Sequence, residues 1–350
     1  MTSIWLVDLT FLATLVAASF RIATPILFAA LGEAVAESAG ILNVGIEGMM
    51  AIGAVTGFLV SFSTGGQWLG FAAAFLAGGV AGLVFGYVTV ERGADHVVTG
   101  IVLNIFCFGL ASLAFKGLFT RASEVPEIKV MPIWRIPWLS QIDFFGRALF
   151  SQTPAVYIAF GLVPVFWFLL FRTQWGLRVR STGENPAAAE SAGINVWNIR
   201  LGACAIGGAM AGAAGATLAI AQLGLYLDNM TGGRGFIALA LVVFGGWNPW
   251  RIAGAALLFG GAEALQLRIQ AIGVAIPHAI LLAVPYALTI VVIAAFAGKA
   301  SYPAAMNTPY PRRSAAKRPI GEAAPKKPYA PNAQTAETQA RSTLEEGAGS

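Results

Sequence analysis

Long apolar stretches, separated by short polar connections, dominate the hydrophobic pattern of this chain. A membrane-crossing helix needs about 20 predominantly apolar residues, whereas a membrane-crossing strand needs only about 10 alternating ones. Stretches of helical length occur at Ile4–Leu31, Glu47–Phe62, Trp68–Val90, Val97–Leu118, Pro154–Phe171, Leu201–Leu223, Trp250–Leu267 and Ala279–Ala297. The stretch Phe236–Gly245 is too short to cross alone and predicts a half-helix. We expect an all-α polytopic membrane protein with about nine transmembrane helices (range 8–10) and broken or re-entrant segments.

Composition supports this fold class. The chain of 350 residues is 57% hydrophobic and only 11% charged, whereas a soluble domain carries about 25% charged residues. This excludes a water-soluble globular domain. Cys107 and Cys204 lie inside apolar runs, which favours buried thiols over a disulfide or a metal pair. Residues 298–350 are rich in Pro, Ala and charge, so we expect a transmembrane domain over 1–297 and a disordered, dispensable tail over 298–350.

Basic residues predict the orientation. The tail and the segment 178–200 are rich in Lys and Arg, so both are expected in the cytoplasm, and the net charge of +5 does not indicate a nucleic-acid partner. The first apolar stretch contains Arg21 and Pro25, so it is either one tilted helix, with the N-terminus outside, or two helices, with the N-terminus inside. The Pro- and Trp-rich connection Phe119–Thr153 is expected to lie on the outer membrane face, although it also carries basic residues.

The segment Arg178–Arg200 is a polar island between two apolar regions. It predicts a short helix over Pro186–Ala192, with Asn185 as N-cap and Gly193 as the stop. An isolated helix of about two turns is marginal in water, so it needs a surface on which to dock. The alternative is an ordinary amphipathic loop.

Polar side chains within apolar sequence are candidates for a solute pathway. Glu47 could line such a pathway, or it could cap a helix or pair with an arginine. Asn43 could bind a polar solute, although holding the glycine-rich turn is the favoured role. Asn104 and Gln222 could contact a sugar or a base, or could form hydrogen bonds between helices.

Two arginines near the C-terminal half have competing interpretations. Arg234 lies among glycines in a predicted outer loop, where it could contact another protein outside the membrane or stabilise the loop. Arg268 is expected to form an ion pair with Glu263, although their i, i+5 spacing is slightly off ideal; the alternative is that Glu263 belongs to a solute site.

Four segments resemble a known family. The sequence SAGILNVGIEGMM at Ser38–Met50 is similar to a signature of the membrane subunits of ABC importers in the branched-chain amino acid, ribose and nucleoside superfamily. Gly183–Asn195, NMTGGRGFIALA at Asn229–Ala240 and GGWNP at Gly245–Pro249 narrow the resemblance to the smaller permease of importers fed by a basic-membrane-lipoprotein-type binding protein. Those systems are associated with nucleosides and simple sugars. The resemblance covers about Thr10 to Ala297.

The resemblance implies a non-catalytic permease in the bacterial inner (plasma) membrane, with a cytoplasmic C-terminus. Its partners would be an ABC ATPase, a second and larger permease, and a periplasmic or lipoprotein substrate-binding protein. The implied ATPase-coupling residues are Gly183, Glu184, Asn185, Pro186, Glu190 and Gly193. The chain contains no G-x-x-x-x-G-K-[ST] phosphate loop, so ATP and magnesium would be bound by the partner.

Two other classes of function compete with an importer permease. An ion- or proton-coupled secondary transporter would need a titrating carboxylate in mid-membrane, and most acidic residues here lie near the ends of spans. A membrane-embedded enzyme has less support, because the sequence shows neither a metal-ligand cluster nor a nucleophile–His–acid arrangement and has only two histidines.

Overall fold

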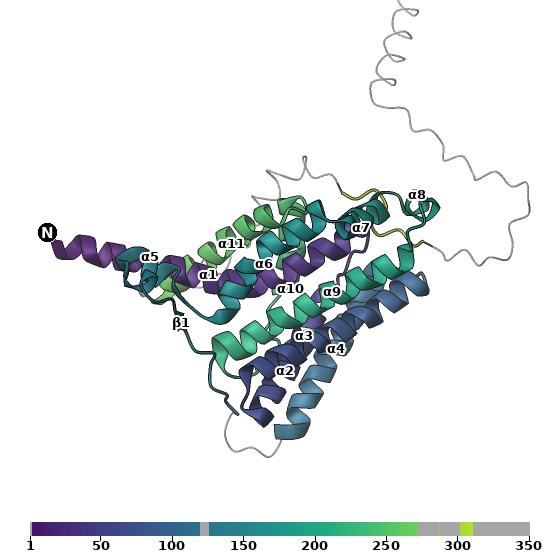
Figure 1. The fold of residues 1–350 in the computed structure, drawn as a ribbon. Helices are drawn as coiled ribbons and strands as arrows, with labels where there is room; N and C mark the ends of the chain where they lie inside the picture. Colours follow the sequence, from purple (N-terminus) through teal and green to yellow (C-terminus); the bar gives the residue numbers. More distant parts are fainter. Residues whose placement is uncertain (1, 120–125, 272–286, 288–301, 311–350) are drawn as a thin grey trace, which may run out of the picture. The chain divides into compact units, whose positions relative to one another are not determined.

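The computed structural model describes residues 2–119, 126–271, 287 and 302–310 and is almost entirely helical in this part (Figure 1). The long helices are α1 (Thr2–Ser38), α2 (Ile46–Thr64), α3 (Gln67–Gly86), α4 (His96–Phe119), α6 (Pro154–Arg172), α9 (Val196–Ala216) and α11 (Pro249–Ala271). The π-helical turns η1 (Tyr87–Glu91) and η3 (Thr217–Leu223) continue α3 and α9. The short elements are β1 (Trp134–Arg135), η2 (Leu139–Gln141), α5 (Asp143–Ala148), β2 (Ser151–Gln152), α7 (Gln174–Glu184), α8 (Pro186–Ser191) and α10 (Arg234–Gly245). Strands β1 and β2 pair antiparallel, with Trp134 opposite Gln152.

Seven helices in the described part are long and apolar enough to cross a membrane. They confirm the predicted all-α polytopic fold, and α10 is too short to cross, as expected. The predicted span 279–297 lies outside the described residues apart from Ala287. The first stretch is one unbroken helix, α1, which continues through Arg21 and Pro25.

Helix α9 forms the centre of the bundle, and glycines allow α3 to pack directly against it. Gly78 and Gly82 of α3 face Gly208 and Gly212 of α9, and a Cβ atom at any of these positions would lie closer than 3.0 Å to backbone atoms of the other helix. Small residues permit such close approach between helices in lipid, where dispersion contacts rather than the hydrophobic effect hold helices together. Helix α9 is the most enclosed of the described spans, whereas α4 exposes large apolar side chains such as Ile105 and Phe106.

Two helices begin in the interior of the bundle. After α1 ends, residues 39–45 lead to α2, whose Gly53 packs against Gly212. Gly212 is 16 residues beyond Val196, the first residue of α9, which corresponds to about 24 Å along the helix. Helix α2 therefore covers only the half of the bundle that is distant from the start of α9. Helix α10 covers the other half, because it begins beside Glu47 and is followed by Trp247, which contacts Glu37 near the end of α1.

The bundle has two distinct ends. Figure 1 shows α7 and α8 near one end of α9, and α5 and β1 near the other end of the bundle. The connection after α4 lies at the second end, because Ile128 N donates to Gly224 O at 2.8 Å and Met131 N donates to Ile220 O at 3.1 Å. Its Trp134 and Trp138 side chains are exposed, as expected of structure at a membrane interface. The connection 126–153 and the polar island thus lie at opposite ends, which agrees with the prediction that they face opposite sides of the membrane.

The structure departs from the expected disordered tail at residues 302–310. This segment lies at the same end as α8, where Ala305 N donates to Gly183 O at 2.8 Å and Asn307 N donates to Gly40 O at 3.1 Å. The rest of the predicted tail, residues 298–301 and 311–350, lies outside the described residues. The hydropathy of the tail gave no sign that residues 302–310 pack against the bundle. Most hydrogen bonds of this segment are made by backbone groups, which hydropathy does not report.

Cysteine labelling tests the orientation of the two ends. Single cysteines at Ser63 in the last turn of α2 and at Ser140 in η2 should react with an impermeant maleimide in intact cells, whereas a cysteine at Ser191 of α8 should react only after permeabilisation. The starting protein would carry Cys107→Ala and Cys204→Ala, so that the introduced cysteine is the only thiol that can react. Labelling of Ser191→Cys in intact cells, with protection of the other two, would invert the proposed topology.

Candidate functional site

The polar island folds into two short helices, α7 and α8. The Asn185 side chain caps α8 as predicted, since its Oδ1 accepts a hydrogen bond from Ala188 N at 3.0 Å. Pro186 occupies the first helical turn, and Gly193 adopts a φ of 81°, which favours glycine and ends the helix. The predicted helix over Pro186–Ala192 is thus confirmed, while α7 was not foreseen.

The position of α8 is fixed through its neighbours. A Cβ atom at Gly183 would lie closer than 3.0 Å to Ser38 O, so only glycine allows α7 to approach the end of α1. Within α8 only Ala189 is buried, whereas Ala187, Ala188 and Ser191 are exposed. Helix α8 therefore presents a face of small side chains to solvent.

Arg200, near the start of α9, is buried at the same end. Its Nε donates to Ala39 O at 3.2 Å and its Nη1 donates to Thr308 O at 3.0 Å. A buried guanidinium requires several acceptors, and here two segments distant in sequence supply them. From the sequence, Arg200 served only as one of the basic residues that predict orientation, because both of its acceptors are backbone carbonyls of distant segments.

Glu47 connects the two helices that begin inside the bundle. Its side chain is 2% exposed, its Oε1 accepts from Gly233 N at 2.7 Å, and its Oε2 accepts from Gly235 N at 2.5 Å. Glu47 lies in the first turn of α2 and caps the first turn of α10, so it is close to the positive ends of both helices. Both carboxylate oxygens are used within the chain, which favours the capping alternative over direct contact with a solute.

Asn43 and Asn104 hold the chain that leads into α2. Asn104 Oδ1 accepts from Gly48 N at 2.7 Å, and its Nδ2 donates to Val44 O at 2.9 Å. Asn43 Oδ1 accepts from Gly45 N at 3.1 Å, as expected for a residue that stabilises a turn. Both amides therefore satisfy backbone groups that would otherwise be buried without partners.

Two further carboxyl groups of α1 are fully buried. Glu33 Oε1 accepts from Asn43 N at 2.9 Å, and Glu37 Oε2 accepts from Trp247 Nε1 at 2.7 Å. These bonds connect the end of α1 to the entry of α2 and to the turn between α10 and α11. No group of three or more His, Cys, Asp or Glu side chains in the described part of the chain is arranged to hold a metal ion.

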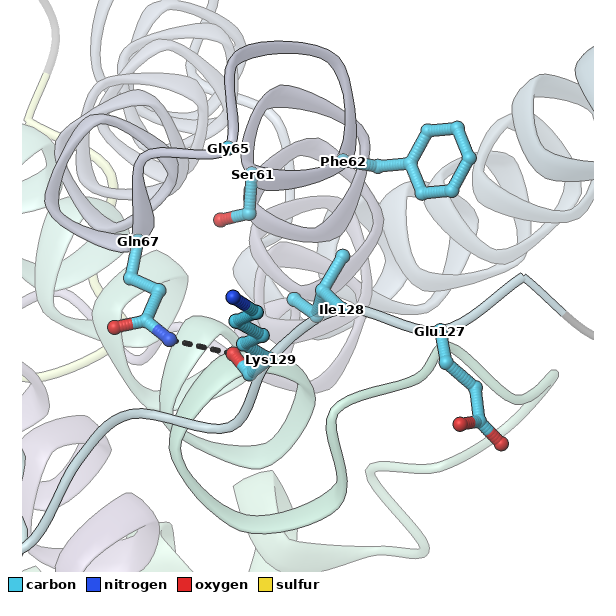
Figure 2. A pocket seen from close by; sticks show the side chains of 7 residues that line it. All are labelled: Ser61, Phe62, Gly65, Gln67, Glu127, Ile128 and Lys129. Carbon is cyan, nitrogen blue, oxygen red and sulfur yellow. Dashed lines mark hydrogen bonds between the residues drawn. The ribbon is translucent and has the colours of Figure 1, made fainter.

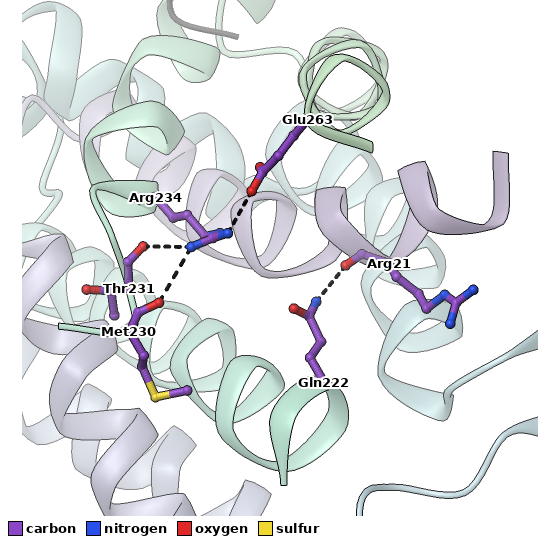
Figure 3. Close-up of polar contacts among 6 residues, drawn as sticks. All are labelled: Arg21, Gln222, Met230, Thr231, Arg234 and Glu263. Carbon is purple, nitrogen blue, oxygen red and sulfur yellow. Dashed lines mark hydrogen bonds and ion pairs between the residues drawn. The ribbon is translucent and has the colours of Figure 1, made fainter. Parts of the chain in front are cut away.

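Gln222 replaces a backbone hydrogen bond that is missing in α1. Proline has no N–H group, so Pro25 cannot donate to the carbonyl four residues earlier, which belongs to Arg21. Gln222 Nε2, in η3, donates to Arg21 O at 2.7 Å instead (Figure 3). This is a hydrogen bond between helices, the alternative that the sequence left open for this amide.

Arg234 has an acidic partner inside the chain. Its Nη2 lies 2.8 Å from Glu263 Oε1, and both side chains are largely buried (Figure 3). This pair favours a structural role for Arg234 over the predicted contact with an external binding protein. The expected pairing of Glu263 with Arg268 is wrong, because Arg268 donates to Phe11 O and its guanidinium lies over the Phe11 ring.

A pocket of about 290 Å³, shown in Figure 2, lies between the end of α2 and residues 127–129 of the connection after α4. Ser61, Gln67 and Lys129 line it, and Gln67 Nε2 donates to Lys129 O at 2.5 Å. The nearby Tyr226 ring packs on Phe115 with 4.9 Å between centroids. Burial, together with the negative charge of Asp228, raises the pKa of the Tyr226 phenol to about 12, so it stays neutral at physiological pH.

Comparison with known proteins identifies the class of this bundle. The family described as the permease component of branched-chain amino acid transport systems matches residues 15–293. The chain belongs to this family. It is therefore a membrane permease of an ABC importer, and the alternative of a secondary transporter is set aside.

Curated relatives cover most of this permease. The putative glucose ABC transporter permease TsgC13 of Haloferax volcanii is 39% identical over 77% of the chain and 81% of its own length. The guanosine ABC transporter permease NupQ of Bacillus subtilis is 35% identical over 85% of the chain and 97% of its own length. The nucleoside ABC transporter permease NupC of Lactococcus lactis is 35% identical over 82% of the chain and 93% of its own length. No solved structure matches the chain.

Proposed function

We propose that this permease forms half of the translocation pathway for a nucleoside or a simple sugar. The observation that carries the proposal is its similarity, over more than three quarters of its length, to permeases named for guanosine, nucleosides and glucose. The other half would come from a second, larger permease. An external binding protein would deliver the solute, and a separate ATPase would bind ATP and magnesium.

We infer that α8 is the element that couples the permease to the ATPase. Asn185, Pro186 and Gly193 define its ends, and Gly183 lets the preceding helix α7 pack against the end of α1. The carboxylates of Glu184 and Glu190 accept hydrogen bonds from residues 302–310, so they face the permease as well as any partner. The surface left for an ATPase groove is the face of Ala187, Ala188 and Ser191, where small side chains allow close approach.

For the four residues predicted to line the pathway, a role in holding the backbone replaces direct contact with the solute. Asn43, Glu47, Asn104 and Gln222 each use polar atoms to satisfy backbone groups of other segments. We propose that the junction around Glu47, where α2 and α10 begin, is part of the pathway because its conformation sets the position of both helices. Direct contact between these four side chains and the solute is not required.

A matched pair of substitutions tests this function. Ser191 and Ser63 are both exposed serines in the last turn of a helix, but they lie at opposite ends of the bundle. Ser191→Trp should reduce retention of the ATPase by the purified permease at least about tenfold, since a blocked contact at the centre of an interface costs 2 kcal/mol or more. Uptake of labelled guanosine or glucose should fall with it, and Ser63→Trp should leave ATPase retention unchanged.

The result that would contradict the proposal is equally concrete. Wild-type ATPase retention and wild-type uptake in the Ser191→Trp variant, at normal abundance, would exclude α8 as the coupling element. Uptake of neither class of solute by the wild-type complex would exclude the proposed substrates.

A further inference from the structure

Residues 302–310 connect several parts of the α8 end of the bundle. Ala305 N donates to Gly183 O at 2.8 Å, and Asn307 N donates to Gly40 O at 3.1 Å. The buried Arg200 donates to Thr308 O at 3.0 Å. One short segment therefore contacts the end of α1, the end of α7 and the start of α9.

The same segment contacts two carboxylates at α8: that of Glu184, which precedes the helix, and that of Glu190, which lies within it. The Tyr310 hydroxyl donates to Glu190 Oε2, and Ala304 N donates to Glu184 Oε2 at 3.4 Å. The Tyr310 ring packs on Trp197 of α9 with centroids 5.5 Å apart. At the other end of the segment, the Tyr302 ring packs edge-on against Trp247 at 5.3 Å.

These contacts matter because α8 cannot hold its position alone. It has 6 residues and buries one of them, Ala189, whereas helices much longer than this are marginal in water. Its exposed face makes no contribution to docking within the chain. Hydrogen bonds to an ionised acceptor are among the stronger ones in proteins, so the bond from Tyr310 to Glu190 is well suited to fix the helix.

We propose that residues 302–310 form a brace that holds α8 in the orientation in which its ATPase partner binds it, with Tyr310 as the positioning residue. The proposal rests on the proposed function of α8 and deepens it. The brace and the exposed face of α8 together form the docking surface, and the ATPase contacts a helix that is already ordered. The functional boundary of the tail then lies after Tyr310 rather than at residue 298.

The test compares two truncations and two point variants of the full-length chain. A chain that ends at Pro311 keeps the brace, whereas a chain that ends at Ser301 loses it. Tyr310→Phe removes only the hydroxyl and keeps the ring on Trp197. Tyr302→Phe is the matched control, because it removes a hydroxyl from the same segment at a site where the ring makes the contact.

Two measurements are needed, and the first requires no partner. Hydrogen exchange of the α8 amides should accelerate about tenfold in Tyr310→Phe and more in the chain that ends at Ser301, because a hydrogen bond to a charged group is worth about one order of magnitude in an equilibrium. The chain that ends at Pro311 and Tyr302→Phe should match the wild type. ATPase retention by the purified permease should weaken in the same order.

The outcomes separate this proposal from the proposed function. Equal α8 exchange with and without residues 302–310, in a chain that retains its ATPase, would overturn the brace alone. If the wild-type permease does not retain an ATPase, the proposed function fails and the docking role of the brace fails with it.

Discussion

Gly212→Ala is expected to remove most of the folded permease from membranes, whereas Gly202→Ala on the same helix is expected to leave its abundance unchanged. A Cβ atom at Gly212 would lie closer than 3.0 Å to the Ala74 carbonyl oxygen of α3, while a Cβ atom at Gly202 meets nothing within 4 Å. Overpacking typically costs about 1–3 kcal/mol. Here the opposing atoms are backbone, which no change of rotamer can move, so the cost should be at the upper end or beyond.

The measurement is the amount of monodisperse permease in detergent extracts, together with its apparent melting temperature. A loss of about 3 kcal/mol is a large fraction of the 5–15 kcal/mol that stabilises a typical protein. Both variants add the same methyl group to α9, so a difference between them reports only the α3 contact. Equal abundance and equal melting temperatures would show that the backbones of α3 and α9 are not in close contact at Gly212.

The spans and the short helix could be predicted because their signals are local. Runs of apolar residues define the long helices, and the caps of α8 lie within two residues of its ends. The half-helix α10 was likewise predicted from its length. Local patterns carry this information because a helix in lipid must satisfy its backbone groups within its own segment.

The polar partners could not be predicted, because each pair joins segments that are distant in sequence. Gln222 donates to the Arg21 carbonyl, Glu47 accepts from the amides of Gly233 and Gly235, and Arg234 forms an ion pair with Glu263. Composition shows that such groups need partners but not which ones. The expected Glu263–Arg268 pair failed for this reason, since spacing within one helix was the only available guide.

The depth of α2 and α10 also depends on distant contacts. The sequence predicted an outer loop at Arg234, where α10 begins. The structure instead brings Glu47 and Gly235 into contact, so both helices begin at one level inside the bundle. A hydropathy pattern reports that a segment is apolar but not where along the membrane normal it starts.

Glu47→Ala is expected to reduce the stability and abundance of the permease strongly, and transport should fall only in proportion to the folded protein. The substitution removes the acceptor of two backbone N–H groups, one of which is buried and the other partly buried. An unsatisfied buried donor costs about 1–3 kcal/mol. Glu47→Gln should be intermediate, because the amide offers one acceptor oxygen but places a donor opposite the second N–H.

The exposed cap at Asp95 provides the control. Asp95 Oδ1 accepts from Val98 N at 2.9 Å at the start of α4, where water can replace it, so Asp95→Ala should cost only about 1 kcal/mol. The decisive readout is KM for uptake, normalised to folded permease. A capping role leaves KM unchanged while the melting temperature falls in the order wild type, Gln, Ala. A normal melting temperature with an altered KM would instead mean that Glu47 contacts the solute, and the backbone amides of α10 would then be satisfied by another acceptor during transport.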